Sequence, residues 1–190
     1  MPRVDYCILV TFPIACLACG ENNDAPTAGL MPPAAQASLS FVFGDHAAGG
    51  PVCPFPGSTH NIGGPPNSAI ADPGQREVDG TTGVRVGCRV AGTGTFEVQA
   101  NAAKGNTSFT LTGGSVTVGG SGGATIELAA DGNQAGAPTG SPCEFAVSRS
   151  PFQVIAGAIW AEFECPVVVS TQNNVVCSAR GEFVFENCEE

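Results

Sequence analysis

The chain has 190 residues, among them 26 glycines, 15 prolines and 9 cysteines, and 13% of its side chains are charged, whereas about 25% is usual in soluble domains. Its 7 basic and 17 acidic side chains give a net charge of −10, so nucleic acid and other polyanions would be repelled and are excluded as partners. This length suits one domain of about 150 residues with additional terminal segments.

The amino end carries the pattern of a signal peptide. Residues 1–18 contain the apolar run CILVTFPIACLA, which ends in small side chains and is followed by the polar residues GENND. A bilayer span needs about 20 apolar residues, and this run is shorter and contains Pro13. We therefore predict an exported chain; the alternative is a buried first strand that would keep Cys7, Cys16 and Cys19 within the fold.

The segment Cys16-Leu17-Ala18-Cys19-Gly20 resembles the lipobox of bacterial lipoproteins, in which a small residue precedes a cysteine that becomes the lipidated first residue. The resemblance implies that Cys19 carries a diacylglyceryl thioether and an N-acyl chain such as palmitate, which together suffice for stable membrane anchoring. The residue after Cys19 is Gly20 and not Asp, a pattern similar to that of lipoproteins sorted to an outer membrane or cell surface. Ordinary cleavage after Ala18 would instead give a soluble periplasmic or secreted protein.

The cysteine count supports cleavage before Cys19. The cysteines that remain beyond it are even in number: Cys53, Cys88, Cys143, Cys165, Cys177 and Cys188. An even set in an exported chain predicts disulfides, here three, whereas a zinc site would need short C-x₂₋₄-C spacings that these six lack.

Six cysteines allow many pairings. We expect Cys165 to pair with Cys177, because the two flank a predicted hairpin. We also expect Cys188 to reach an early strand, and Cys53 to hold the long irregular stretch 44–83.

Beyond the leader, composition and periodicity predict a tether followed by strands. Residues 20–37 are rich in Ala, Pro, Gly and Asn and have no sustained period, which is typical of a flexible linker. Period-two alternation between Gly-, Pro- and Asn-rich turns predicts strands at 38–43, 84–90, 95–102, 107–112, 115–118, 124–130, 143–148, 152–165, 175–179 and 182–186.

These elements define the expected fold and its boundaries. Many short strands without an amphipathic helix predict an all-β domain, an antiparallel β-sandwich or a jelly roll with Gly/Pro-rich loops, stapled by disulfides. The predicted division is a signal peptide at 1–18, a lipid anchor and tether at 19–37, and the β-sandwich at 38–190.

One pattern resembles a catalytic site. Gly119 to Gly123 contain G-x-S-x-G around Ser121, but a nucleophile elbow needs a helix and a later histidine, and His46 and His60 both precede Ser121. We interpret this segment as a glycine hairpin.

Metal donors gather in the long irregular stretch. Asp45, His46, Cys53 and His60 lie close in sequence, yet their spacing matches no established site, and Cys53 is needed for a disulfide. The sequence therefore predicts no catalytic residue, no metal and no cofactor.

The best candidate for ligand binding is the set Trp160, Glu162 and Glu164, which share one strand face if Ile159 and Phe163 point to the core. A tryptophan ring beside carboxylates would suit the C–H groups and hydroxyls of a sugar. The alternative is structural: residues 154–161 are apolar on both faces, so Trp160 would pack beneath a loop while the glutamates are solvated.

These observations predict an exported cell-envelope lipoprotein with a non-catalytic domain for surface interaction or a structural role. Its expected partners are a membrane, through the lipid anchor, and a glycan or an envelope protein. The alternative function is a secreted carbohydrate-binding or carbohydrate-cleaving protein that uses the face of Trp160, Glu162 and Glu164.

Overall fold

The computed structural model describes residues 32–46, 52–64, 66, 75–148 and 150–190. The predicted signal peptide, Cys19 and most of the predicted tether lie outside these residues. The strands are β1 Gln36–Asp45, β2 His60–Ile62, β3 Glu77–Val78, β4 Val84–Thr93, β5 Thr95–Lys104, β6 Thr107–Thr117, β7 Ser121–Ala130, β8 Asn133–Gly136, β9 Cys143–Ala146, β10 Gln153–Ile155, β11 Ala158–Ser170 and β12 Val176–Glu186. Within the described ranges, no helix is long and apolar enough to cross a membrane.

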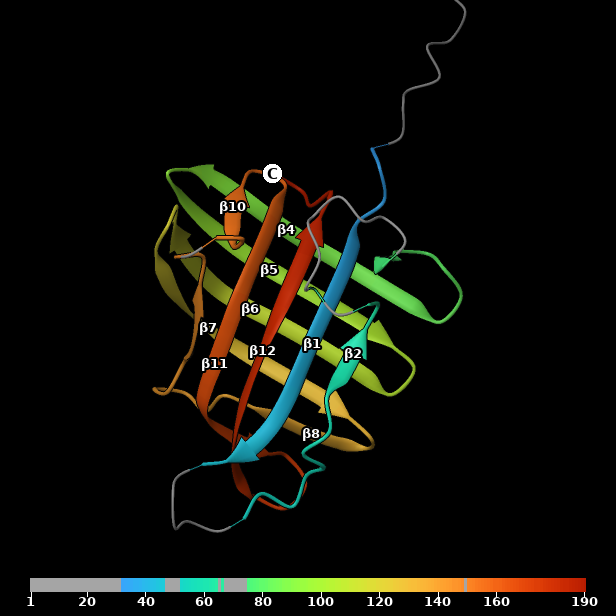
Figure 1. Cartoon of the computed structure of the whole chain (residues 1–190), viewed down its shortest axis with the longest axis vertical. Coiled ribbons are helices and arrows are strands. Elements are labelled where there is room, and N and C mark those ends of the chain that lie inside the picture. The colour runs from blue at the N-terminus through green and yellow to red at the C-terminus, as the bar shows by residue number, and fades with distance from the viewer. Residues whose placement is uncertain (1–31, 47–51, 65, 67–74, 149) are drawn as a thin grey trace, which may run out of the picture. The chain divides into compact units, whose positions relative to one another are not determined.

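The strands form an all-β fold in two layers, which confirms the predicted fold class. Hydrogen bonds connect them in the order β2-β1-β12-β11-β8-β7-β6-β5-β4, and all named strand pairs are antiparallel. Figure 1 shows the front layer, with β11, β12 and β1, crossing over the back layer of β4 to β8. Because the back layer follows chain order as a meander, the topology is a sandwich without the Greek-key crossing of a jelly roll.

Phenylalanine rings fill the space between the layers. Phe183 on β12 has no exposed surface, and its ring centroid lies 5.3 Å from that of Phe109 on β6 and 6.2 Å from that of Phe145 on β9. Alternate residues of a strand point to opposite faces. The outer face of the front layer points away from this core and therefore carries the alternate residues of the same strands.

Most predicted strands are present with shifted ends; β1, for example, begins at Gln36, within the predicted tether. Three further predictions are wrong in where one strand ends and the next begins. The predicted strand 152–165 is a hairpin, since Ala156 and Gly157, with φ of 78° at Gly157, form a turn between β10 and β11. The predicted pairs 107–112 with 115–118 and 175–179 with 182–186 are instead the continuous strands β6 and β12. The short strands β2, β3 and β8 were not predicted, because two to four residues are too few to show a period.

All six predicted cysteines form disulfides. Cys53 pairs with Cys177, Cys88 with Cys188 and Cys143 with Cys165, with Cα–Cα distances of 5.2, 4.8 and 4.2 Å. Disulfides persist in oxidising compartments, so the domain belongs to an extracytoplasmic environment.

The predicted pair Cys165–Cys177 is wrong. The two residues lie on neighbouring strands but are not opposite each other: Cys165 faces Ala179, Cys177 faces Val168, and the register shifts between Cys165 and Val168. The expectations for Cys188, which reaches the early strand β4, and for Cys53, which fixes the irregular stretch to β12, are confirmed.

The carboxyl end closes the edge of the back layer. Val90 on β4 donates its N–H to the Glu189 carbonyl at 2.8 Å, and Glu189 donates to the Cys88 carbonyl at 3.0 Å. Together with the Cys88–Cys188 bridge, these bonds cover the outer edge of β4, which would otherwise offer unpaired groups to another chain.

Candidate functional site

The outer face of the front layer carries two rows of residues that cross five strands. One row runs through Ser40, Glu182, Glu162, Ala146 and Ser121, which are consecutive partners on β1, β12, β11, β9 and β7. The second row lies two residues away along each strand and consists of Val42, Arg180, Glu164, Glu144 and Gly123. The register therefore brings residues from five separate segments of the chain onto one face.

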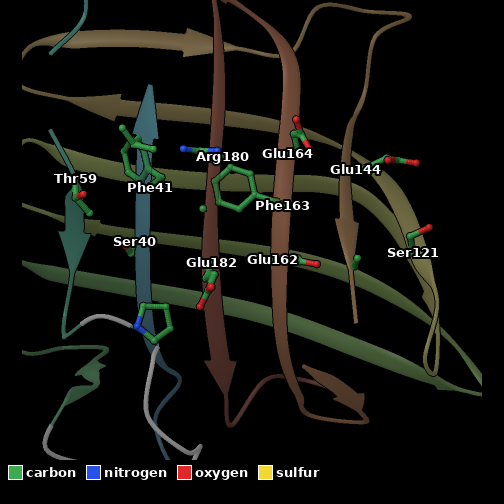
Figure 2. Close-up of a pocket in the computed structure, with 14 residues that line it drawn as sticks. Ser40, Phe41, Thr59, Ser121, Glu144, Glu162, Phe163, Glu164, Arg180 and Glu182 are labelled. Atoms are coloured by element: carbon green, nitrogen blue, oxygen red, sulfur yellow. The ribbon is translucent and has the colours of Figure 1, made fainter. Parts of the chain in front are cut away.

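These rows border an open cleft of about 580 Å³, which we call the acidic cleft. Its polar lining consists of Glu144, Glu162, Glu164, Glu182, Arg180, Ser40, Thr59 and Ser121. Figure 2 shows these side chains around the faces of β11 and β12, with Glu162 and Arg180 directed to opposite sides in that view. Carboxylates and hydroxyls at such a surface can accept hydrogen bonds from a cation or from sugar hydroxyls.

Gly181 lies in the lining of the cleft, at a close approach of β1 and β12. A Cβ atom at this position would collide with the Ser40 carbonyl oxygen and would lie 2.9 Å from Phe163 Cε1. Phe41 and Phe163, which lie beside Gly181 in the pairing of β1, β12 and β11, also line the cleft. Glycine at 181 is therefore required by the close approach of β1 and β12 and by the neighbouring ring of Phe163.

The cleft is negatively charged, since four glutamates face one arginine. Glu144 and Glu164 are directly opposite each other on β9 and β11, and both are exposed. Like charges opposite each other across a strand pair destabilise a sheet by about 0.2–1 kcal/mol. Arg180 lies opposite Glu164 on the other side, but within the described ranges no ion pair joins them.

The structure separates the three residues that the sequence proposed as one site. Glu162 and Glu164 line the acidic cleft. Trp160, although on the same face, is 3% exposed and packs edge-on against Phe152 with ring centroids 5.9 Å apart. An exposed tryptophan platform is therefore wrong, and the structural alternative, with Trp160 beneath a neighbouring segment, is confirmed.

Trp160 belongs to a covered part of the outer face. Its partner Val184 and the next residue in that row, Ser38, have no exposed surface. Ser38 donates its hydroxyl to the Gly64 carbonyl, which places the segment after β2 over this part of the sheet. We call Ser38, Trp160 and Val184 the covered patch.

A buried ion pair borders the covered patch. Arg76 Nε donates to Glu186 Oε2 at 3.1 Å, and Gln36 Nε2 donates to the same oxygen at 2.7 Å. The Arg76 side chain has no exposed surface and that of Glu186 is 11% exposed. Among the residues that the structure describes, both terminal nitrogens of Arg76 and Trp160 Nε1 have no hydrogen-bond partner although they are buried, so this polar group is incompletely satisfied by them.

Ser121 is a strand residue and does not lie on a strand-to-helix turn, the backbone context that a nucleophile elbow needs. It begins β7 and pairs with Ala146 on β9. A Cβ atom at Gly122 would collide with the Ser115 carbonyl oxygen, so this glycine serves the close approach of β6 and β7. The interpretation of the segment as a glycine hairpin agrees with this geometry.

The loop residues with metal-donor groups have separate structural roles. Asp45 Oδ1 accepts the N–H of Cys53 at 2.7 Å, His46 Nδ1 lies 2.9 Å from the Pro166 carbonyl oxygen, and Cys53 is in a disulfide. His60 is buried against Phe41, with ring centroids 5.3 Å apart. In the part of the chain that the structure describes, no group of three His, Cys, Asp or Glu side chains could hold a metal ion.

Three lining residues, Glu144, Arg180 and Glu182, were not predicted from the sequence. Alternation in the predicted strands 143–148 and 182–186 already placed Glu144 and Glu182 away from the core. The missing information was which strands are neighbours, because β9 pairs with β11 while β11 pairs with β12. Such long-range register cannot be read from period-two patterns alone.

No protein-family model, no curated protein and no solved structure matches the chain.

Proposed function

We propose that this chain is an exported cell-envelope lipoprotein whose β-sandwich binds a cationic segment of an envelope protein, without catalysis, in the acidic cleft. The observation that carries the binding proposal is the pair of cross-strand rows that brings four glutamates around one open depression. The three disulfides support an extracytoplasmic location. Lipid attachment to Cys19, at an outer membrane or cell surface, is the part of the proposal that rests on the lipobox resemblance.

The disulfide pairing is compatible with a separate role for Cys19. The six cysteines beyond it pair with one another, so none of these six remains as a partner for its thiol. Intact mass of the protein purified from its host tests the anchor, because one spectrum reports the cleavage site and the added acyl mass. In cell fractionation, Cys19→Ala should move the protein from the membrane fraction to the aqueous fraction; unchanged membrane retention would refute the anchor.

A cationic ligand follows from charge complementarity. The acidic cleft has four carboxylates and one guanidinium, and the whole chain has a net charge of −10. Its glutamates are distributed over three strands, β9, β11 and β12. This distribution suits several positive groups spaced along a peptide, and complementary fields accelerate such association.

Titration with a tetralysine peptide at low ionic strength tests the binding site. Neutralising the exposed pair with Glu144→Gln and Glu164→Gln should weaken binding by about two- to thirtyfold, since each exposed charge contact contributes about 0.2–1 kcal/mol. The matched control is Glu97→Gln with Glu127→Gln, two exposed glutamates on β5 and β7 outside the cleft. Equal weakening in both double variants would mean general charge attraction and would refute a site.

Carbohydrate binding is the second candidate, favoured by the hydroxyls of Ser40, Thr59 and Ser121 beside Glu162 and Glu164 in one depression. A soluble-glycan pull-down separates the two candidates, because neutral glycan binding would persist at high salt while peptide binding would be lost. Trp160→Phe should leave glycan retention unchanged, because the ring is buried. Loss of retention in Glu162→Gln with Glu164→Gln, and salt-independent retention in the parent, would favour the glycan.

A further inference from the structure

All three disulfides join an earlier cysteine to the carboxyl-terminal part of the chain. Cys165, Cys177 and Cys188 are the later partners, and the bridges span sequence separations of 22, 124 and 100 residues. Cys53 and Cys88 therefore have no native partner until β12 and the end of the chain are present.

The two long bridges depend on tertiary structure that brings their sulfurs together. Cys177 lies opposite Asp45 in the β1–β12 pair, and Asp45 Oδ1 binds the Cys53 N–H at 2.7 Å. Cys188 reaches Cys88 where Glu189 forms backbone hydrogen bonds with Cys88 and Val90. Before these contacts form, each long bridge must close a loop of at least 100 residues.

An unfolded chain favours other pairs, because the free energy of loop closure rises with loop length. The separation of Cys177 from Cys188 is about 11 residues and that of Cys165 from Cys177 about 12, so the length law favours each over Cys53–Cys177 by about 30- to 40-fold. By the same law, Cys53–Cys88, about 35 residues apart, is favoured over Cys53–Cys177 by roughly sevenfold. Each of these short bridges is absent from the native structure and occupies cysteines needed for native bridges.

We infer that oxidation of this chain first produces non-native short bridges, and that a thiol–disulfide isomerase of the export compartment is a required partner for its maturation. The need for reshuffling follows from the connectivity; the location of the isomerase rests on the proposed export. During synthesis and export, the early cysteines emerge first and meet the oxidant before their later partners. This order adds to the bias towards Cys53–Cys88.

The exchange balances without net oxidation. A thiolate of the isomerase attacks Cys177 Sγ in a non-native Cys165–Cys177 bridge, forms a mixed disulfide and releases the Cys165 thiolate. The Cys53 thiolate then attacks Cys177 Sγ, forms the native bridge and releases the isomerase thiolate. In a separate oxidation step, Cys143 and Cys165 are joined by a disulfide oxidant such as oxidised glutathione, which is reduced to two thiols that take up the two protons of the cysteine thiols.

Refolding of the full chain tests this inference independently of export and of the cleft. The protein carries Cys7→Ser, Cys16→Ser and Cys19→Ser, so only the six bridging thiols react. The reduced, unfolded chain is oxidised either with a thiol-free oxidant or with a glutathione buffer containing protein disulfide isomerase, and samples are alkylated and mapped by peptide mass spectrometry. We expect the non-native short bridges to exceed Cys53–Cys177 early, each by about sevenfold or more. They should persist without thiol and convert to native bridges with the isomerase. The native Cys143–Cys165 bridge, which closes a loop of 22 residues, should also form early. Cys53–Cys177 or Cys88–Cys188 as the first oxidised species in thiol-free oxidant would overturn the inference.

A pair of variants sharpens the test. Cys53→Ala with Cys177→Ala removes the cysteine shared by the two shortest non-native loops. The native Cys143–Cys165 loop of 22 residues and the non-native Cys165–Cys188 loop of about 23 residues are then about equally favoured, so the dependence on exchange should fall without disappearing. The matched control, Cys143→Ala with Cys165→Ala, removes one native bridge but keeps the Cys177–Cys188 trap and should still require the isomerase. Equal isomerase dependence in the two variants would show that short loops are not the trap. Because bridge mapping does not require a fully folded product, either result remains readable, and a failed lipid or peptide-binding test would leave it unaffected.

Discussion

The covered patch and the acidic cleft occupy the same face of the same two strands, yet they have opposite characters. Trp160 and Val184 of the covered patch are 3% and 0% exposed. Two residues further along each strand, Glu162 and Glu182 line an open depression. The strands present both pairs in the same way, so the difference arises from the segments that lie over the sheet. A side chain's face is decided locally, whereas its exposure is decided by distant parts of the chain.

The two regions also differ in how their polar groups are satisfied. At the border of the covered patch, Glu186 accepts hydrogen bonds from Arg76 and Gln36 out of solvent. In the acidic cleft, Glu144 and Glu164 face each other in solvent. Changes to the first region should therefore affect the free energy of unfolding, and changes to the second should affect ligand binding.

The largest effect is expected for Trp160→Ala, which should lower the free energy of unfolding by about 3–5 kcal/mol, because it removes a large buried ring. Denaturant unfolding measures this, and Val118→Ala at a position that is 66% exposed is the control, with a change of less than about 0.5 kcal/mol. Trp160 is the single tryptophan of the chain, so its fluorescence should be blue-shifted and protected from acrylamide. Ready quenching in the native protein would contradict the buried position.

Glu186→Ala should lower the free energy of unfolding by about 3–4 kcal/mol, because it leaves the buried Arg76 guanidinium without its carboxylate. The double variant Arg76→Met with Glu186→Leu removes both charges and should be less destabilised than the single variant. Urea unfolding of the two proteins compares them. A double variant that loses as much stability as Glu186→Ala, or more, would mean that the ion pair itself, and not the orphaned charge, is at stake.

Much of the fold could be predicted because the alternation of apolar and polar residues along the chain indicates most of its strands. The segments at 84–90 and 95–102 are strands β4 and β5 with their expected buried faces. The hairpin at Gly157 was missed because its flanking residues are apolar on both faces, which removes the period-two signal. Its apolar outer face exists because Trp160 is covered by the segment that contains Phe152, and that contact is not visible in a strand pattern.

The disulfides and the site show the same limit. The number of bridges followed from counting cysteines, but the choice of Cys165–Cys177 rested on sequence proximity, and the structure pairs these cysteines with more distant partners. Of the cleft, Glu162 and Glu164 could be identified because they lie on one predicted strand. Glu144 and Glu182 join them only through the register of β9, β11 and β12, which depends on global packing.

The Cys143–Cys165 bridge connects the interior to the cleft, since it ties β9, which carries Glu144, to β11, which carries Glu164. Cys143→Ala with Cys165→Ala should lower the free energy of unfolding by about 3 kcal/mol according to the chain-entropy model for a loop of 22 residues. It should also weaken tetralysine binding, because β9 is less firmly held. Cys88→Ala with Cys188→Ala, at the edge strand β4, is the control for binding and should leave the affinity unchanged. Loss of affinity in the control alone would contradict the assigned position of the site.

The smallest effect is expected for the like charges in the acidic cleft, which should lower the free energy of unfolding of the native protein. Glu144→Gln removes one member of the exposed like-charge pair with Glu164, so the free energy of unfolding should rise by about 0.2–1 kcal/mol at low salt. The gain should shrink at high ionic strength, because exposed charges are then screened. Glu97→Gln, on the exposed face of β5, is the matched control and should change stability less. If the Glu144→Gln protein is more stable and yet binds tetralysine less well, the Glu144 carboxylate opposes folding and favours the ligand, as expected of a binding residue. A loss of stability would instead identify Glu144 as a structural contact.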